Sequence, residues 1–274
     1  MSTTTLRVKK APGFRVDASP LLPELLDGKP LAEIERIVLH AGNEACAVGD
    51  LFDVARSESD AGGPTLMIEG AGPWLDRLGV AMNGGHLVVQ GAAGDYAGHR
   101  MAGGVLSVGG NAGHFTACEM RGGRLTVNGN TGDFAASALP GDMDGMTGGT
   151  LAIHGNAGAR LADRMRRGLV LVGGNAGEFA ASRLVAGTVC IAGELGPHYA
   201  YGMRRGTLLL AREPQRLPPT FAGGGRGFGV FWSLLVRSLA GEMAPFSAWS
   251  AARLPARYTG DLAVDGRGEI LIPG

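Results

Sequence analysis

Apolar positions recur every 19 residues between residues 82 and 210. The spacings between successive unit starts are 19, 19, 26, 19, 19 and 19 residues, and a seven-residue insertion within 136–145 accounts for the longer one. The unit starts are Met82, Met101, Met120, Met146, Met165, Leu184 and Met203. Such a period is the sequence signature of a repeat architecture. A unit this short predicts two or three brief strands and no helix of ordinary length.

Within each unit, apolar residues alternate with variable ones over a short stretch. Offset 5, counted from the unit start, holds Leu or Val, and offset 7 holds Val, Ile or Leu. This period of two predicts strands whose offsets 5 and 7 point inward while their neighbours face outward. Stacked units would pair each strand in parallel with its equivalent, about 4.8 Å away. The methionines at the unit starts are interpreted as core residues, because Met fills irregular gaps.

Glycine occupies three fixed columns of the repeat. Offset 3 is glycine from Gly85 to Gly206, and offsets 9 and 12 are glycine from the unit of Met82 to that of Leu184. Glycine at a fixed place predicts corners, where the backbone adopts a positive φ or another segment approaches closely. Small residues at offset 16 also suit a tight corner. Offset 10 holds an asparagine column, interpreted either as a side-chain amide ladder or as turn residues alone. Its members are Asn111, Asn130, Asn156 and Asn175.

These patterns predict an all-β fold: a right-handed single-stranded parallel β-helix with about 19 residues per coil, capped by short N- and C-terminal segments with a C-terminal helix. We expect one structural domain in three parts. These are an N-terminal cap and first coil over 1–60, the glycine-repeat β-helix over 61–211 and a C-terminal cap over 212–274. Coils are expected to begin before Met82. We also expect a helix near Leu31–Ile37, a helix over 229–240 that covers the last coil, and a hairpin in the tail from Arg257.

Composition narrows the function classes. Lys plus Arg and Asp plus Glu number 25 each, so no global basic field favours nucleic acid or an anionic membrane. The three cysteines are far apart, which argues against a disulfide framework and a zinc site. The N-terminal residues lack the apolar core of a signal peptide, and no stretch reaches the roughly 18 apolar residues of a membrane span. We therefore expect a cytoplasmic location.

The motifs of catalytic sites are missing from the sequence. The histidines of the repeat share no column, and neither a nucleophile elbow nor a Walker motif is present. Asp95, Asp133 and Glu178 share offset 13, with His114 in the same column. Because that offset lies beside a glycine corner, we interpret these side chains as turn residues rather than a catalytic groove. We expect no catalytic, cofactor-binding or metal-binding residue on this chain.

Arginines gather near the unit starts. They are Arg100, Arg121, Arg164, Arg166, Arg167, Arg183, Arg204 and Arg205. Stacking would place them along one edge, with only Glu119, Asp144 and Asp163 near in register. Arginine favours bidentate contacts with carboxylate or phosphate and is enriched at protein interfaces. Two interpretations remain open: an edge that binds a partner or an anionic ligand, and a solvated corner.

With the repeat in view, the sequence closely resembles the C-subunit family of formylmethanofuran dehydrogenase, within the group that shares the glycine-repeat domain of glutamate synthase. The resemblance covers nearly the whole chain. It rests on the stretches 19–43, 82–210 and 257–271, together with the insertion LPGDMDGMTGGT at 139–150. The repeat alone would suit the broad group, whereas the insertion and the two terminal stretches indicate the C-subunit family.

The resemblance implies a scaffold subunit without an active site of its own. The expected partner chains are amidohydrolase-like, formyltransferase-like and molybdopterin-subunit-like, and a methanofuran-like carrier and a metal are expected on them. Only three lysines stand among the 25 basic residues, which favours a GC-rich bacterial genome. In methylotrophic bacteria, the family implies a formyltransferase/hydrolase complex that converts formyl-tetrahydromethanopterin to formate. The alternatives are the C subunit of a molybdenum or tungsten formylmethanofuran dehydrogenase, and a stand-alone β-helix enzyme or binding module.

Overall fold

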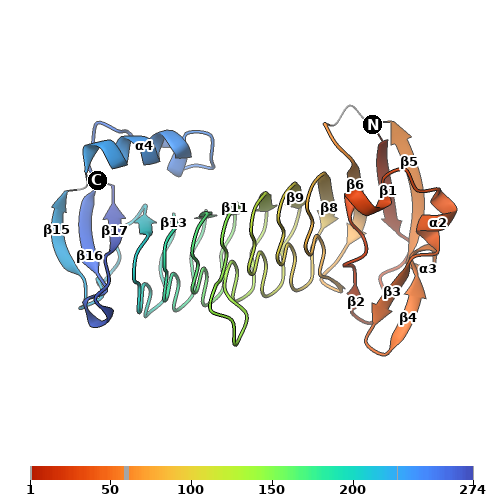
Figure 1. The fold of residues 1–274 in the computed structure, drawn as a ribbon, viewed down its shortest axis with the longest axis horizontal. Helices are drawn as coiled ribbons and strands as arrows, with labels where there is room; N and C mark the ends of the chain where they lie inside the picture. Colours follow the sequence, from red (N-terminus) through yellow and green to blue (C-terminus); the bar gives the residue numbers. More distant parts are fainter. Residues whose placement is uncertain (1, 59–61, 227, 274) are drawn as a thin grey trace.

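Short strands stacked along one long axis make up most of the molecule (Figure 1). The computed structural model describes residues 2–58, 62–226 and 228–273. One sheet contains thirteen strands in the order β15-β16-β17-β14-β13-β12-β11-β10-β9-β8-β6-β1-β5. The repeat strands are β8 (His86–Gly91), β9 (Val105–Val108), β10 (Arg124–Val127), β11 (Thr150–Ile153), β12 (Leu169–Val172), β13 (Thr188–Ile191) and β14 (Thr207–Leu210). The fold is therefore mainly β, as the sequence predicts.

The repeat strands pair in parallel and in the predicted register. Leu87 pairs with Leu106, and across the insertion Leu125 pairs with Leu151. Residues at offsets 5 and 7 are buried throughout, as are Met82, Met101 and the other unit starts. Repeats also begin before Met82, because β6 (Thr65–Ala71) pairs in parallel with β8. The inward columns thus form one continuous core along the stack.

A second row of parallel contacts follows the asparagine column. Isolated bridges run from Ala112 through Thr131, Ala157 and Ala176 to Leu195. The asparagine side chains do form a ladder. The Oδ1 atom of each accepts the backbone N–H one unit later, at 2.8 Å from Asn130 to Asn111 and at 2.7 Å for the next two steps. The last rung joins the N–H of Glu194 to Asn175, so an acidic side chain ends the column.

The glycine columns serve two different needs. At offset 3 every glycine has a positive φ, from 76° at Gly85 to 106° at Gly168, which side chains rarely tolerate. At offset 9 the need is space. A Cβ on Gly129 would lie well inside van der Waals contact with Asn111 Oδ1. The asparagine ladder therefore requires the glycine column beside it.

One corner is left-handed without glycine, which the sequence did not reveal. Phe115, Ala117 and Glu119 have φ values of 58°, 55° and 53°, and offsets 14 and 16 are left-handed in the other units too, with glycine there at Gly79 and Gly98. Such a conformation costs roughly 1–2 kcal/mol per residue. Backbone bonds between units hold it, such as Phe115 N–H to Asp133 O at 2.9 Å. The aromatic rings at this corner stack, with centroids 5.0 Å apart between Phe115 and Phe134.

The N-terminal elements close one end of the stack. β1 (Ser2–Val8) pairs in parallel with β6 and antiparallel with β5 (Phe52–Glu58). β2 (Val16–Asp17) pairs in parallel with β7 (Leu75–Asp76) in a four-stranded sheet that also holds β3 (Val38–Ala41) and β4 (Glu44–Ala47). The short helices are α1 (Pro23–Leu26), α2 (Leu31–Glu35) and α3 (Val48–Leu51). The helix predicted near residue 31 is confirmed.

The C-terminal elements close the other end in a different way. β15 (Ala222–Arg226), β16 (Ala256–Gly260) and β17 (Gly268–Ile272) extend the large sheet. The predicted hairpin is confirmed by the antiparallel β16–β17 pair, and β17 also pairs in parallel with β14. Two 3₁₀ turns lie at Phe246–Ala248 and Leu262–Val264.

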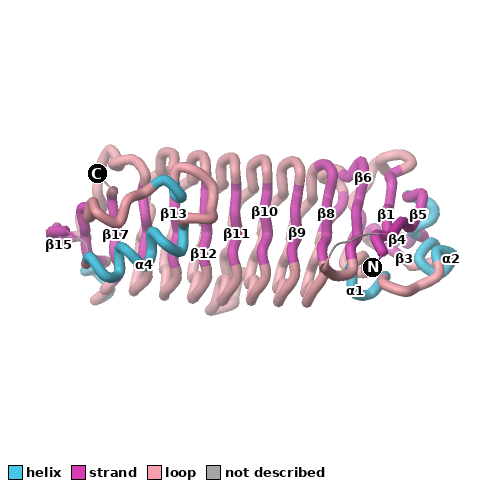
Figure 2. The backbone as a smooth tube through the Cα atoms, turned by 90° about the horizontal axis from the view of Figure 1, so that it is seen from above, coloured by secondary structure: helices cyan, strands magenta, loops and turns pink. Residues whose placement is uncertain are grey.

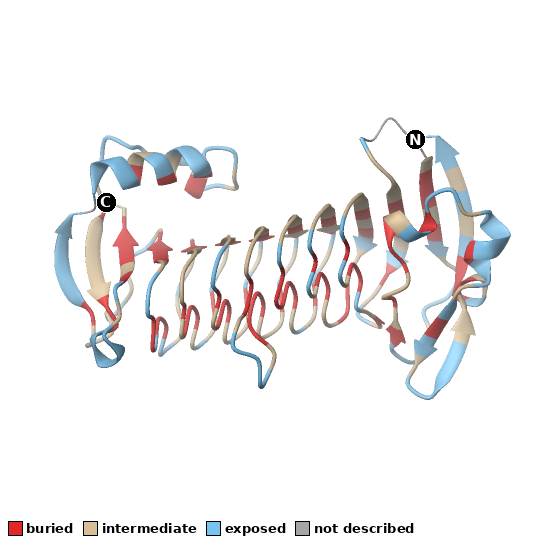
Figure 3. Ribbon diagram, viewed as in Figure 1, coloured by how far each residue is buried: buried red, intermediate tan, exposed pale blue. Residues whose placement is uncertain are grey.

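The predicted helix α4 (Gly229–Leu239) is present and packs on the outer face of the last strands, including Leu209 of β14, rather than over the end of the last coil. It crosses the outer face of the strands (Figure 2) and buries Trp232, Leu235 and Leu239 there. The outward column changes character beneath it. Ser107 and Thr126 are half-exposed, whereas the equivalent residues of β11 to β14 are buried (Figure 3). These buried residues are Ala152, Leu171, Cys190 and Leu209. An apolar outer face therefore attracts the helix to the flank.

Candidate functional site

The arginines near the unit starts fall into three columns. Offset 18 holds Arg100, Arg164 and Arg183, offset 1 holds Arg121, Arg166 and Arg204, and offset 2 holds Arg167 and Arg205. Backbone bonds such as Arg183 N–H to Tyr201 O at 2.7 Å keep the columns in line. The arginines of offset 18 are themselves the last left-handed residues of the corner, and the other two columns follow directly after it.

Several of these arginines already bind carboxylates of this chain. Arg100 Nε donates to Glu119 at 2.7 Å, and Arg183 Nε donates to the buried Asp163 at 2.9 Å. Such charge-assisted bonds fix the guanidinium groups in one orientation. The structure thus makes part of the arginine edge an internal ion-pair network.

The insertion supplies more acidic partners than the repeat register suggested. Arg166 forms an ion pair with Asp144, as expected, but Asp142 also contributes. Arg164 Nη1 donates to the backbone O of Asp142 at 2.6 Å, and Arg100 lies 3.7 Å from its carboxylate. The expectation that only Glu119, Asp144 and Asp163 would lie near the arginines is therefore wrong, because the inserted loop folds back onto this edge.

A hollow of about 320 Å³ lies between the insertion and the arginine edge. Its lining includes Arg100, Glu119 and Asp142. Burial opposes ionisation of Glu119 most strongly, but the hydrogen bonds from Arg100, Asp142 and the Leu139 N–H together outweigh it and lower the pKa of Glu119. The pKa of Asp142 is raised, because it shares a hydrogen bond with Glu119. With carboxylates facing the arginines, this hollow is electrostatically balanced rather than an anion site.

Four arginines of the edge have a different environment. Arg121, Arg167, Arg204 and Arg205 are exposed, and no carboxylate of the described residues lies within ion-pair distance of them. We call these four the outer arginines. They are the members of the predicted edge whose charges are available to another molecule.

Two of the three carboxylates of offset 13, Asp95 and Asp133, accept backbone N–H groups at the turn. Asp95 Oδ1 accepts the N–H of His114, and Asp133 Oδ1 accepts that of Ala159, both at 2.8 Å. Each side chain thereby holds the corner of the following unit. In the part of the chain that the structure describes, no three His, Cys, Asp or Glu side chains gather closely enough to hold a metal ion.

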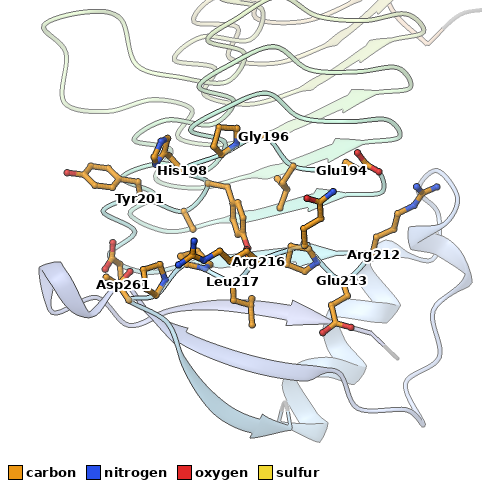
Figure 4. A pocket seen from close by; sticks show the side chains of 18 of the residues that line it. Glu194, Gly196, His198, Tyr201, Arg212, Glu213, Arg216, Leu217 and Asp261 are labelled. Carbon is orange, nitrogen blue, oxygen red and sulfur yellow. The ribbon is translucent and has the colours of Figure 1, made fainter.

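A larger cavity, of about 820 Å³, lies at the C-terminal end of the stack and was missed by sequence reasoning (Figure 4). One wall is the last repeat unit, from Gly193 to Tyr201, and the other is the proline-rich stretch 212–220 with Asp261 and Ala263. The available signal was the end of the repeat, followed at once by prolines, which leaves the last corner without a following unit.

Three polar side chains of this cavity, those of Tyr199, Asp261 and His198, are engaged in structural contacts. Tyr199 donates its hydroxyl to Arg216 O at 2.7 Å, and burial raises the pKa of Tyr199 to about 12. Asp261 accepts the N–H groups of Gly202 and Ala263, both at 2.9 Å. His198 stacks on Phe179 with ring centroids 5.0 Å apart. These contacts bring together no nucleophile and general base.

Comparison with known proteins shows the family to which the chain belongs. No protein-family model matches it. Among solved structures, it matches the X-ray structure of the formyltransferase/hydrolase complex (FhcABCD) from Methylorubrum extorquens in complex with methylofuran. The TM-score is 0.88 with 38% identity, and the match covers 98% of this chain and 99% of that one. The chain belongs to the C-subunit family of formylmethanofuran dehydrogenase. The match includes both caps and the insertion, so membership in the family does not rest on the glycine repeat alone.

Curated relatives of the family match over a shorter stretch. The C subunit of the formyltransferase/hydrolase complex Fhc of Methylorubrum extorquens is 40% identical over 91 residues, 33% of either chain. The C subunit of the tungsten-containing formylmethanofuran dehydrogenase 2 of Methanothermobacter marburgensis is 32% identical over 99 residues, 36% of this chain and 37% of the relative. The chain thus spans about a third of the length of the curated relatives it matches. Among the helices of the described residues, none has the length and apolar character to cross a membrane.

Proposed function

We propose that this chain is the C subunit of a formyltransferase/hydrolase complex and serves there as a noncatalytic scaffold. The observation that carries the proposal is the match to one chain of the FhcABCD structure along 98% of this sequence. A similarity confined to the repeat would fit any glycine-repeat protein. Here the caps and the insertion match as well, and these are the parts through which a scaffold would differ from its relatives.

We also propose the detailed architecture. The strands and bridges form a right-handed single-stranded parallel β-helix with about 19 residues per coil. The parallel steps from β8 to β14 and the bridges in the second row support this. The division into a cap and first coil over 1–60, a β-helix over 61–211 and a cap over 212–274 belongs to the same proposal.

The proposed reaction lies on other chains. The complex would convert formyl-tetrahydromethanopterin to formate through a methanofuran-like carrier, with the carrier and the metal on amidohydrolase-like and formyltransferase-like partners in the cytoplasm. Two observations on this chain support a scaffold. The outward strand residues are mostly small or apolar, and Tyr199 and Asp261 of the large cavity bond to the backbone.

The test is purification of the tagged chain from its native cells, followed by mass spectrometry of what copurifies. We expect amidohydrolase-like and formyltransferase-like chains in fixed stoichiometry. Isolation of the chain alone would contradict the proposal. Copurification of a molybdopterin subunit with ferredoxin-like chains would instead support a formylmethanofuran dehydrogenase, the activity for which the relative from Methanothermobacter is named.

The outer arginines are proposed to bind a partner chain or an anionic ligand. Their exposure and lack of internal partners support this. Replacement of Arg121, Arg167 and Arg204 by Glu together should abolish copurification of a partner or weaken carrier binding. The matched control is Arg36→Glu, which changes an exposed arginine outside the edge. An unchanged complex with unchanged carrier binding in the triple variant would contradict this role.

A further inference from the structure

The last repeat unit lacks a contact that every earlier unit makes. In each earlier unit, the residue at offset 11 donates its N–H to the following unit, as Ala157 does to Asn175 O and Ala176 to Glu194 O, both at 2.9 Å. From Ala112 to Ala176 its carbonyl also accepts an N–H from the following unit, as Ala176 O does from Gly196 at 2.8 Å. The equivalent residue of the last unit is Leu195. Within the described part of the chain, neither its N–H nor its carbonyl has a backbone partner.

The same break extends along the whole corner. At offset 14, Phe179 donates to Pro197 O at 2.9 Å, but His198 finds no such acceptor among the described residues. Gly174 O and Ala180 O accept N–H groups from the last unit, whereas their equivalents Gly193 O and Tyr199 O accept no backbone N–H of the described residues. Five backbone groups therefore face away from the stack in one row: Gly193 O, Leu195 N–H, Leu195 O, His198 N–H and Tyr199 O.

The C-terminal cap closes the neighbouring positions and leaves this row open. At Gly202 the missing partner is replaced by Asp261, whose Oδ2 accepts the N–H at 2.9 Å. Met203 O then accepts the N–H of Asp261 at 3.1 Å, and β17 covers β14. The open row thus begins after the strand and ends where Asp261 takes over. It forms one wall of the 820 Å³ cavity, opposite 212–220 (Figure 4).

The inward side chain of this wall, that of Leu195, occupies the same position as the inward residues of the earlier units. The inward residues of the row, Ala112, Thr131, Ala157 and Ala176, are buried by their neighbours, whereas Leu195 is half-exposed at the end. An unpaired parallel edge beside an apolar surface is the arrangement that extended peptides occupy by strand addition.

We propose that this groove binds an extended segment of a partner polypeptide, parallel to Gly193–Tyr201, as the next member of the second row. The inference deepens the proposed function and rests on it, since it assigns a docking site to a scaffold. Two features favour a partner over other occupants. No described residue after Tyr201 forms a backbone bond with the open row, and the cavity of about 820 Å³ beneath 212–220 suits a short segment rather than the capped end of a second copy.

The geometry also fixes the chemistry of the segment. Its backbone must present a carbonyl to Leu195 N–H and an N–H to Leu195 O. A small or medium apolar side chain must lie over Leu195, as Ala176 lies beneath it. One further N–H of the segment would meet the carboxylate of Glu194, which ends the asparagine ladder.

Amide hydrogen exchange at single-residue resolution tests the proposal. The probe is the full chain alone compared with the complex purified from native cells. The Leu195 and His198 amides should exchange at least about 100-fold more slowly in the complex. The amides of Gly193 and Ala200 are controls, because they bond to Gly174 O and Ala180 O within the chain and should be slow in both states. Equal rates for Leu195 and His198 in an intact complex would overturn the inference while leaving the scaffold role standing.

A photo-crosslink identifies the occupant without requiring the isolated chain to fold. Benzoylphenylalanine is placed at His198, in the groove, and in a matched control at Val38, which is exposed on the N-terminal cap. In the complex, the groove probe should join a peptide of a partner chain, and the control probe should not join that peptide. A crosslink to a second copy of this chain, or no crosslink to any chain, would overturn the proposal.

The variant Leu195→Pro provides a third measurement. It removes the free N–H without breaking a bond within the chain, and Leu195→Val keeps that N–H as its control. The Pro variant should dissociate from the partner at least about tenfold faster than the Val variant, each being followed in the tagged complex by dilution. Equal dissociation rates would contradict pairing at this edge.

Discussion

The two ends of the stack differ in which rows of backbone hydrogen bonds are covered by the terminal segments. At the N-terminal end, β1 covers the strand row at β6, and β2 covers the second row at β7. At the C-terminal end, β17 covers the strand row at β14, and the second row is left open beside a cavity. The comparison shows that closure of stacked β-units is achieved row by row. An end can be stable along one row while another keeps its hydrogen-bonding groups available.

Removal of the helix anchor at the C-terminal end should have the largest effect. Trp232 is buried, packs near Trp249 and donates to Ser250 O at 3.0 Å. Trp232→Ala should lower the free energy of unfolding by about 3–5 kcal/mol. It should also expose Cys190, whose pKa is raised by burial, to thiol reagents. Urea unfolding and thiol titration measure both effects. An unchanged Cys190 reactivity would show that α4 does not protect the outer face.

Disruption of the closed second row should come next. Val16 donates its N–H to Trp74 O at 2.8 Å and is fully buried. Val16→Pro removes that bond and leaves the carbonyl without its partner, so we expect a loss of about 2–4 kcal/mol in urea unfolding. Val16→Ala separates the loss of side-chain packing from the loss of the bond. Equal stability of the two variants would mean that this row needs no backbone closure.

Substitution of the residue that ends the open row should have a smaller, pH-dependent effect. Burial opposes ionisation of Asp261, but its hydrogen bonds outweigh that and lower the pKa below the ordinary 3.8. The stabilisation is therefore present above pH 3.8 and is lost as the pH falls through the lower folded value. Asp261→Asn should cost about 1–2 kcal/mol near pH 7. Thermal unfolding from pH 7 to 3 should show the two proteins converging in acid; a constant difference would contradict a role of the charge.

The smallest change in the free energy of unfolding is expected at the open second row of the C-terminal end. Leu195→Pro, the counterpart of Val16→Pro at the open row, breaks no bond among the described residues. In the isolated chain its free energy of unfolding should change by less than about 1 kcal/mol. Urea unfolding of both proline variants side by side measures the contrast. A loss at Leu195 as large as at Val16 would mean that the second row is closed at both ends.

Much of the stack could be predicted from the sequence because its signals are local and repeated. The inward Leu and Val columns follow from alternation, and the glycines of offset 3 follow from the need for positive φ. The left-handed corner could not be predicted. Phe115, Ala117 and Glu119 have no preference for that conformation, and only bonds to the neighbouring units hold it.

The functional regions were predicted less completely, because they depend on where distant segments fold. The arginine columns were visible, but Asp142 reaches them only through the conformation of the inserted loop. The position of α4 did have a signal in the sequence, because the outward column changes from Thr126 to the apolar Ala152 and Leu171. The open row was invisible, since its existence depends on the path of the chain after Leu210.

The uniform parallel pairing fixes the distance between the first and last strands of the repeat. From β8 to β14 there are six steps of about 4.8 Å, which set these two repeat strands roughly 29 Å apart. Deletion of one whole unit, residues 165–183, would join equivalent positions and shorten that distance by one step. The separation between anything bound at the two ends can therefore change only in discrete increments, counted in whole repeats.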